Sequence, residues 1–395
     1  MKLKTPGLFP YTVAGVAAPG SLGIQSSTSG VGDPGYSQTA ANLVHHRRPG
    51  SALLQFLAAL LALALPLRAA ETPATAPTAS TSALPPSHEV CVIIGAPGDE
   101  TYTQGFAAAA KNWETACQQA GATCTVLGLA PEGDKIPTDH DQLQAWIAKL
   151  DPVSGPPVWI AYVGHGTFDG REARMNLRGP DVTPAELAAW LKPVTRPVIF
   201  IHGGSASEPF LAALSGPNRV IITATQNSRE INYCRFGERF AAALTDPASD
   251  LDQDGQISLL EAFVTASQQT QTFYKENGRM ASEHAMIDDN GDKRGTPAEW
   301  FAGTRLTKHP ANGVVADGAR ARLITLKVSD AERTMTAAQF QLRDQCENQL
   351  EQLKAGKPNM SDADYYAALE PILRQLATVY VPPPPAATPA QPAPP

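Results

Sequence analysis

The sequence predicts an α/β protein, with a mainly parallel sheet covered by helices on both faces and a C-terminal helical segment. Two observations support this fold class. Five short segments read as strands, and residues 89–95 form a continuous apolar run, as expected of a strand that is buried on both faces. Segments of helical length and periodicity separate most of these strands, and strands that alternate with helices favour parallel pairing.

The expected elements follow in chain order. Strands are predicted at 89–95, 123–127, 158–163, 197–201 and 219–224, with helices between them at 106–120, 141–150 and 183–191. Thr183 is the predicted N-cap of the last of these helices, because Glu186 completes a capping box with it. Beyond the fifth strand, helices are predicted at 236–244 and 259–270.

The C-terminal segment, residues 306–380, is predicted to contain two more helices, at 330–353 and 362–380. Residues 320–328 before them are interpreted as a strand or a linker. Pro371 falls inside the second helix and is expected to kink or split it, because proline cannot donate a backbone hydrogen bond. We expect an antiparallel helical pair packed on the core, and the alternative is a partner-binding or dimerising arm.

The region before the first strand indicates export. Residues 1–46 are interpreted as a disordered extension or as sequence upstream of the true start. Residues 47–69 join a basic flank to a short apolar run and small residues, which is the pattern of a signal peptide, with an uncleaved anchor as the alternative. Residues 70–88 form an Ala/Thr/Pro linker and residues 381–395 a Pro-rich tail. We expect localisation in the periplasm, cell envelope or extracellular space, without stable membrane insertion after signal cleavage.

The charge balance bears on the class of partner. The formal net charge of the chain is −7, and removal of residues 1–69, with five basic residues and one acidic residue, makes it about −11. This argues against nucleic acid as a partner, because phosphate binding requires a basic face. All five cysteines lie beyond residue 69, so an odd thiol remains. Cys117 and Cys124 flank a turn and are candidates for a disulfide.

Residues 250–261, DLDQDGQISLLE, have the spacing of an EF-hand-type calcium loop. Asp250, Asp252 and Asp254 occupy loop positions 1, 3 and 5, and the glycine at position 6 permits a sharp turn. The main-chain carbonyl of Gln256 and both carboxylate oxygens of Glu261 would complete the ligand set. The sequence therefore predicts a calcium site, and the alternative is a solvated acidic turn before a helix.

A second acidic element at 288–292, DDNGD, repeats part of this spacing and has Glu299 at position 12. Lys293 replaces the turn glycine and brings a positive charge into the loop. A second metal site remains one interpretation. The other is a turn in which Asp and Asn side chains accept hydrogen bonds from their own backbone.

Two predicted strand ends carry groups that are capable of chemistry. The third strand ends in Gly-His-Gly, with His165 and Gly166, and the fourth is followed by a Gly-Gly-Ser run that contains Ser205. Because ligands bind at the carboxyl ends of parallel strands, we expect these residues in one cleft, as a base and a nucleophile. The alternative is that both side chains make ordinary loop hydrogen bonds.

Residues from about 89 to 300 resemble the caspase-like fold, most closely the bacterial form of the legumain-type peptidases, family C13. The resemblance is carried by YVGHG at 162–166, NLRGPDVTPAELAAWL at 176–191, SGPNRVIITAT at 215–225, and the two acidic loops. It implies a caspase-like domain over 89–305, which contains loop 250–261, and it implies that His165 stands at the family's catalytic histidine.

The sequence departs from this family at the nucleophile. Members carry an acid-Ala-Cys-x-Ser-Gly element after the fourth strand, and the register places Ser205 where the cysteine should be and Gly203 at the acid. A thiol ionises near neutral pH, whereas a hydroxyl must lose its proton to a base during attack. Cys234 is the only other thiol considered as a nucleophile, and its position after the fifth strand predicts that it lies away from the strand end.

Three functions follow from these observations. The first is an exported calcium-binding homologue that has lost peptidase activity and binds a peptide or protein. The second is an active endopeptidase or hydrolase with Ser205 as nucleophile, His165 as base and the Gly166 N–H in the oxyanion hole. The third is a structural cell-envelope protein with a calcium site. The oligomeric state does not follow from the sequence.

Overall fold

The computed structural model describes residues 88–129, 137–310 and 314–380. The interpretations given above for residues 1–46, 47–69 and 381–395, and for the linker up to residue 87, lie outside the described residues. The core elements are β1 (Glu89–Ile94), α2 (Glu100–Ala120), β2 (Thr123–Leu127), α3 (Asp139–Ala148), β3 (Val158–Val163), β4 (Gly166–Phe168), β5 (Ala173–Met175), α4 (Pro184–Leu191), β6 (Val198–His202), α5 (Glu208–Leu214), β7 (Arg219–Thr223), α6 (Phe236–Ala243) and α7 (Leu259–Glu276).

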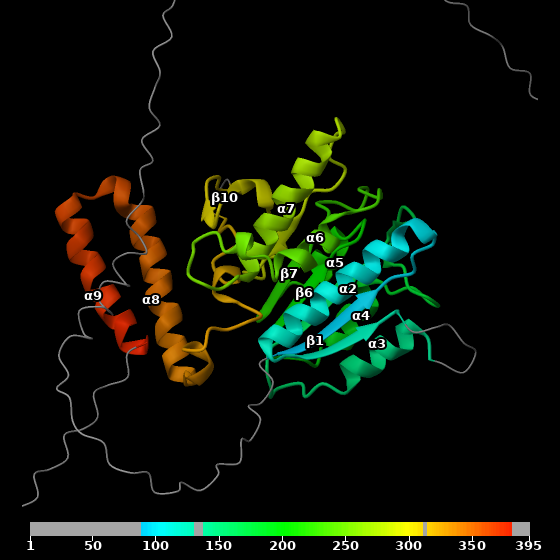
Figure 1. Ribbon diagram of the computed structural model, residues 1–395, viewed down its shortest axis with the longest axis horizontal. Coiled ribbons are helices and arrows are strands. Elements are labelled where there is room, and N and C mark those ends of the chain that lie inside the picture. Colours follow the sequence, from blue (N-terminus) through cyan, green and yellow to red (C-terminus); the bar gives the residue numbers. More distant parts are fainter. Residues whose placement is uncertain (1–87, 130–136, 311–313, 381–395) are drawn as a thin grey trace, which may run out of the picture. The chain divides into compact units, whose positions relative to one another are not determined.

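The later elements are β8 (Met286–Asp288), β9 (Thr296–Pro297), β10 (Phe301–Ala302), β11 (Arg305–Leu306), α8 (Ala337–Gly356) and α9 (Asp362–Tyr380). A seven-stranded sheet has the order β2-β1-β3-β6-β7-β8-β9. The five predicted strands are its parallel part, and β8 and β9 add antiparallel partners at one side. The predicted fold class is confirmed (Figure 1).

Each face of the sheet has its own apolar core, because successive side chains of a strand point to opposite faces. In β1, Val90, Val92 and Ile94 pack with α2, α6 and α7. Cys91 and Ile93 pack on the other face with α3, α4 and α5. Continuous apolar runs in the sequence are therefore explained by burial on both faces, as expected for parallel strands.

Several helix boundaries differ from the prediction. Helix α2 begins at Glu100 rather than 106, because the Asp99 side chain caps it by accepting from the Thr101 N–H. Helix α8 begins seven residues later than predicted, where Thr336 and Gln339 form a capping box. Pro371 does not split α9, which is continuous from Asp362 to Tyr380 and packs along α8.

The segment 320–328 is a linker rather than a strand. It contains a 3-10 helix at Ala321–Leu323 and a single antiparallel bridge between Ser258 and Thr325. The Leu259 N–H also donates to the Ile324 carbonyl at 2.7 Å, so this linker is fastened to the start of α7. Within the described ranges, none of the helices combines the length and the apolar character needed to cross a membrane.

Candidate functional site

The two predicted strand ends lie at the same edge of the sheet. Strands β3 and β6 are parallel neighbours, with Tyr162 opposite His202 in the last pair of their register. His165 follows β3 and Ser205 follows β6, so both loops begin at the carboxyl end of the sheet, where parallel sheets bind ligands.

Ser205 is buried, with 2 % of its surface exposed. Its Oγ donates to the main-chain carbonyl of Asn232 at 2.7 Å. The next residue, Ala206, has a φ of 50°, in the left-handed region that side chains rarely adopt, and its N–H donates to the Glu230 carbonyl at 2.9 Å. The loop after β6 is therefore fastened to the segment 230–232, and the hydroxyl proton of Ser205 points to a carbonyl.

His165 is half-buried among aromatic rings, with centroids 4.5 Å from Tyr102 and 5.5 Å from Tyr233. Its Nε2 lies 3.1 Å from the Pro97 carbonyl oxygen. Because a carbonyl only accepts, Nε2 is the nitrogen that donates in this contact. No hydrogen bond joins His165 to Ser205 in the part of the chain that the structure describes.

No carboxylate of the adjacent turn orients His165. Asp169 pairs with Arg174 at 2.9 Å and accepts from the N–H groups of Arg171 and Glu172. The backbone bond from Glu172, together with the Arg174 side chain, lowers the pKa of Asp169 to about 2. Asp169 therefore stabilises the turn between β4 and β5 and stays ionised there.

Gly166 lies directly against the loop after β6. A Cβ placed on Gly166 would meet the Ser205 carbonyl oxygen at 1.9 Å, a distance that no real side chain tolerates. The glycine is therefore required for close approach of β4 to this loop. The space beside Gly166 is filled by the Ser205 main chain.

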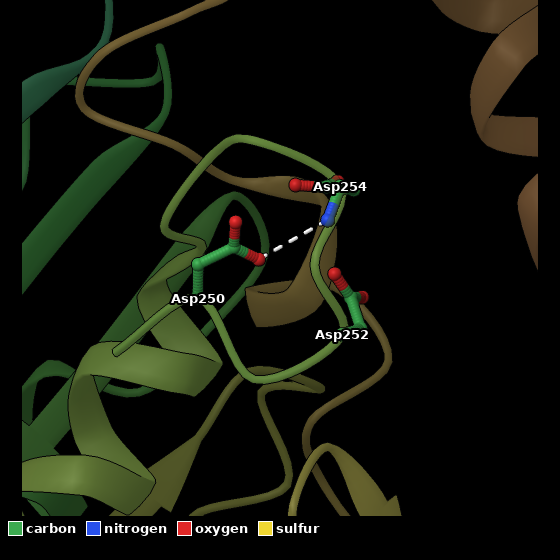
Figure 2. Close-up of side chains that lie close together, drawn as sticks. All are labelled: Asp250, Asp252 and Asp254. Carbon is green, nitrogen blue, oxygen red and sulfur yellow. Dashed lines mark hydrogen bonds between the residues drawn. The ribbon is translucent and has the colours of Figure 1, made fainter. Parts of the chain in front are cut away.

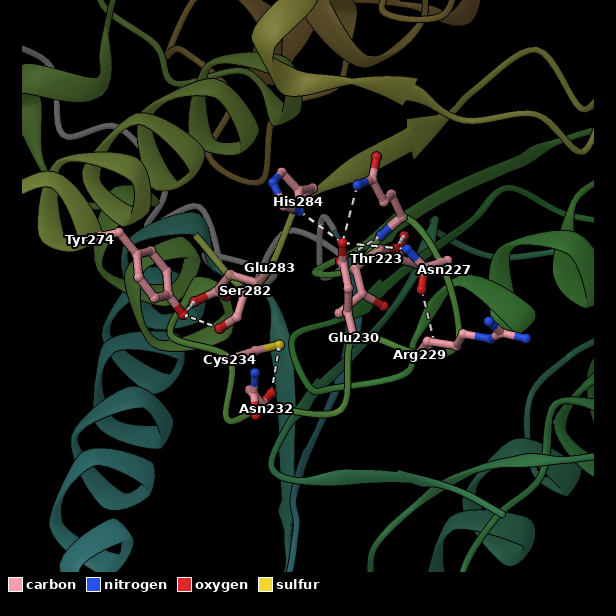
Figure 3. A network of polar contacts seen from close by, with 12 residues as sticks. Thr223, Asn227, Arg229, Glu230, Asn232, Cys234, Tyr274, Ser282, Glu283 and His284 are labelled. Carbon is pink, nitrogen blue, oxygen red and sulfur yellow. Dashed lines mark hydrogen bonds and ion pairs between the residues drawn. The ribbon is translucent and has the colours of Figure 1, made fainter. Parts of the chain in front are cut away.

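The structure corrects the expected position of Cys234. The chain after β7 folds back over the sheet edge, so the Cys234 thiol lies beside the Ser205 hydroxyl, and both side chains donate to the Asn232 carbonyl, the thiol at 3.5 Å and the hydroxyl at 2.7 Å. Figure 3 shows Cys234 with Asn232 and Glu283. Burial, followed by the negative charge of Glu283, raises the pKa of Cys234 well above its ordinary value. Cys234 is therefore a neutral thiol at pH 7.

Glu283 holds this returning segment in place, and nothing in the sequence pattern pointed to it. Its carboxylate is 2 % exposed and accepts from the N–H groups of Arg235 and Phe236 at 2.9–3.0 Å. The Tyr274 hydroxyl also donates to it at 2.9 Å. Because Phe236 begins α6, Glu283 satisfies the free donors at this helix start from a distant part of the chain.

A pocket of about 380 Å³ adjoins the surroundings of His165. It shares Tyr102 and Tyr233 with them. The complete lining is Tyr102, Asn232, Tyr233, Arg235, Phe273, Tyr274, Arg279, Met280 and Ser282, which includes two arginines and no acidic residue. The Arg235 guanidinium lies 4.0 Å from the centroid of the Phe273 ring. The pocket is thus aromatic and cationic in a chain of net charge −7.

The predicted calcium loop lies between α6 and α7 and gathers three carboxylates. One oxygen each of Asp250, Asp252 and Asp254 lies within 4.8 Å of the others (Figure 2). Asp250 accepts from the N–H groups of Asp254 at 3.1 Å and Gly255 at 3.0 Å. Gln253 and Gly255 have φ values of 62° and 89°, which turn the loop inward at positions 4 and 6. This donor set suits a hard cation such as calcium, which takes oxygen ligands only.

Glu261, the predicted bidentate ligand, is buried and not part of this group of three. Its Oε1 accepts from the N–H groups of Leu251 and Asp252, and its Oε2 from the N–H and hydroxyl of Ser258. Glu261 thus joins both ends of the loop and caps α7. Calcium ligation by Glu261 requires that it exchange some of these bonds.

The Gln256 side chain accepts from the Ser329 N–H at 2.9 Å, which ties the loop to the C-terminal segment.

The loop should make the stability of the metal-free protein depend on pH. Partial loss of hydration in the loop, and then repulsion from the neighbouring carboxylates, raises the pKa of Asp252 to about 7 and of Asp254 to about 6, from 3.8; both residues are exposed at the surface, so solvent screens part of this effect. The folded state therefore holds protons that the unfolded state has released, so these two groups contribute less stability as the pH rises from about 4 to 7.

The buried His88 and His202 act in the opposite direction, because burial lowers their pKa values to about 4 and 3. The measurement is therefore a difference in urea unfolding between wild type and Asp252→Asn in EDTA, from pH 5 to 8. We expect the variant to gain stability relative to wild type as the pH rises. A difference that is constant with pH would contradict the raised pKa values.

The second acidic loop fits the turn interpretation. Asp288 accepts from the N–H groups of Gly291 and Lys293, and Asp289 from those of Arg320 and Ala321. Glu299, at position 12, is exposed and pairs with Lys308 at 3.7 Å. Across the described ranges, only Asp250, Asp252 and Asp254 form a cluster of potential metal ligands. Rather than forming a metal site, the 288–292 loop is joined by hydrogen bonds to the segment 317–321.

Comparison with known proteins gives no family assignment. No protein-family model matches the chain, and no curated protein matches it. Among solved structures, the chain is similar to caspase-1 from Spodoptera frugiperda, with 12 % identity, a TM-score of 0.35 and coverage of 56 % of this chain and 94 % of that chain. It is also similar to the Drosophila initiator caspase Dronc, with 12 % identity, a TM-score of 0.36 and coverage of 58 % and 94 %. These values concern the fold alone.

Proposed function

We propose that the protein is an exported, calcium-binding relative of caspase- and legumain-type peptidases that binds a peptide or protein without cleaving it. The observation that carries this proposal is the state of Ser205. Its hydroxyl is buried and donates to the Asn232 carbonyl, and it makes no hydrogen bond to His165. The order of the parallel strands, with His165 and Ser205 after adjacent strands, supports the relationship to that fold.

The chemistry of a serine nucleophile supports the loss of activity. A hydroxyl must pass its proton to a base as it attacks, so the base has to be a hydrogen-bond partner. Here the Ser205 hydroxyl donates to the Asn232 carbonyl oxygen, which cannot act as a base.

The pocket beside His165 supports peptide binding. Arg235 and Arg279 line it together with aromatic rings, and none of the lining residues is acidic. Guanidinium groups form paired hydrogen bonds with carboxylates, and aromatic rings bind the apolar parts of a peptide. We therefore propose a peptide that places an acidic side chain in this pocket. In fluorescence anisotropy, Arg279→Gln should weaken binding of such a peptide, while Arg229→Gln, an exposed arginine outside the lining, should not.

The loop at 250–261 supports the calcium part of the proposal. Three carboxylates converge there, with one oxygen of each within 4.8 Å of the others, and a divalent cation would neutralise this group of acids. Residues 47–69 are the predicted signal peptide. An exported protein would meet calcium at millimolar concentration, which is enough to fill a site of moderate affinity.

Turnover of a diverse fluorogenic peptide library by the mature protein, from Ala70, tests the proposal. The assay contains calcium and a Ser205→Ala control. We expect no cleavage by either protein, together with measurable peptide binding. Cleavage by wild type that is lost in Ser205→Ala would instead establish the alternative, an endopeptidase with Ser205 as nucleophile and His165 as base. Absence of both cleavage and binding would favour a structural protein.

A cysteine at position 205 is not expected to restore activity. In Ser205→Cys the new thiol would occupy the same buried position, next to Cys234 and the Asn232 carbonyl, and burial raises the pKa of a thiol. We expect no detectable turnover, and we expect no more thiols to react rapidly with Ellman's reagent in the folded variant than in folded wild type. Turnover that disappears in a Ser205→Cys/His165→Ala double variant would show that the dyad is intact and that the proposal is wrong.

A further inference from the structure

Helix α2 and strand β2 are joined by a tight reversal that brings two cysteines together. Gly121 ends the helix with a φ of 65°, and the Ala122 N–H donates back to the Cys117 carbonyl at 3.0 Å. Strand β2 starts at Thr123, so Cys124 returns directly over the last turn of the helix. Cys124 packs against the cluster that contains Cys117, and the two thiols lie close enough for each to shift the pKa of the other.

The sheet geometry selects this pair over the nearby Cys91. Cys117 and Cys124 both pack in the core that β1 shares with α2 through Val90. Cys91 packs on the opposite face of the sheet. Val90, and not Cys91, is the register partner of Cys124. The sheet backbone therefore separates Cys91 from the two paired thiols.

We propose that Cys117 and Cys124 form a disulfide bond when the protein meets a thiol oxidant, and that this bond fastens the edge strand β2 to α2. Strand β2 is the first strand in the order of the sheet and has β1 as its neighbour. An edge strand is hydrogen-bonded to a neighbouring strand on one side only. A covalent link to α2 would therefore limit how far β2 can move away from β1. The inference is independent of the calcium loop and of peptide binding.

The two thiols differ in accessibility and in pKa, as thiol–disulfide exchange requires of an attacking and a resolving cysteine. Cys117 is buried, while Cys124 is partly exposed and reachable by a small reagent. The neighbouring Cys117 thiol lowers the pKa of Cys124, and Cys124 is the more accessible of the two, so Cys124 supplies the attacking thiolate. With oxidised glutathione as oxidant, the Cys124 sulfur bonds to one glutathione and releases the other as a thiolate. Cys117 then loses its proton, attacks the Cys124 sulfur and releases the second glutathione. Two protein thiols are oxidised and one glutathione disulfide is reduced.

Mass spectrometry of the full chain tests this bond. The protein is equilibrated with oxidised and reduced glutathione at several ratios, quenched with acid, unfolded and alkylated. We expect oxidised protein to carry three alkylated thiols of its five. The tryptic fragment 112–135, which contains Cys117 and Cys124 and no other cysteine, should lose two hydrogens and stay unalkylated.

Matched variants separate this pair from the alternatives. Cys124→Ser should abolish the unalkylated fragment, and Cys346→Ser, which removes a distant thiol, should preserve it. Reduction of wild type should lower the urea midpoint, whereas reduction of Cys124→Ser should not change it. Five alkylated thiols at every glutathione ratio would overturn the proposal, as would a bond located between any other two cysteines.

Discussion

Calcium at 1 mM is expected to raise the melting temperature of the protein by roughly 5–10 °C at pH 7.5 and low salt. The estimate assumes a dissociation constant of about 10 μM, for which a hundredfold excess of ligand contributes about 2.7 kcal/mol to stability. A domain of this size shifts by about 2–4 °C per kcal/mol. The physical reason is that the cation neutralises Asp250, Asp252 and Asp254, which repel one another in the metal-free loop.

The controls for this effect come from the same chain. Asp250→Ala should abolish the calcium-dependent shift, because its carboxylate both joins the cluster and orders the loop through Asp254 and Gly255. Asp292→Ala, in the second acidic loop, should leave the shift unchanged, since Asp292 is not in the cluster. Differential scanning fluorimetry with calcium and magnesium would measure both. No shift up to several millimolar calcium would show that the loop is only a turn.

The elements that the sequence predicts well are those whose signal is local. The five parallel strands and the Thr183 capping box follow from continuous apolar runs and from a four-residue pattern, and both are present. The acidic loop is similarly local, because twelve consecutive residues determine its shape. The unsplit helix at Pro371 is different, since packing along α8 holds the two halves of α9 together and no local pattern records that contact.

The site at the sheet edge depends on contacts between distant segments. Strand periodicity places His165 and Ser205 at neighbouring strand ends, but it says nothing about the chain after β7. That chain supplies the carbonyl of Asn232, which binds the Ser205 hydroxyl, and brings Cys234 next to it. Its position depends in turn on Glu283, about fifty residues later. A single sequence contains no periodic signal for such a contact, so the burial of Ser205 could not be predicted.

Replacement of Glu283 by alanine is expected to destabilise the protein by about 3 kcal/mol and to weaken peptide binding in the same variant. The main-chain N–H groups of Arg235 and Phe236 and the hydroxyl of Tyr274 would lose their acceptor in a buried place. Each unsatisfied buried donor costs about 1–3 kcal/mol. Removal of a carboxylate whose burial is itself costly offsets part of this loss, as its raised pKa indicates.

The binding effect follows from the position of the segment that Glu283 holds. Tyr233 and Arg235 line the pocket, so release of their main chain would disorder its wall. Glu283→Gln keeps one acceptor oxygen and should lose less stability than Glu283→Ala, and Glu276→Ala, at an exposed position in α7, should stay within about 0.5 kcal/mol of wild type. Urea unfolding and peptide anisotropy on the three variants measure both effects. If Glu283→Ala lost stability but kept full peptide affinity, the pocket beside His165 would not be the binding site, and the proposed peptide would have to bind elsewhere on the protein.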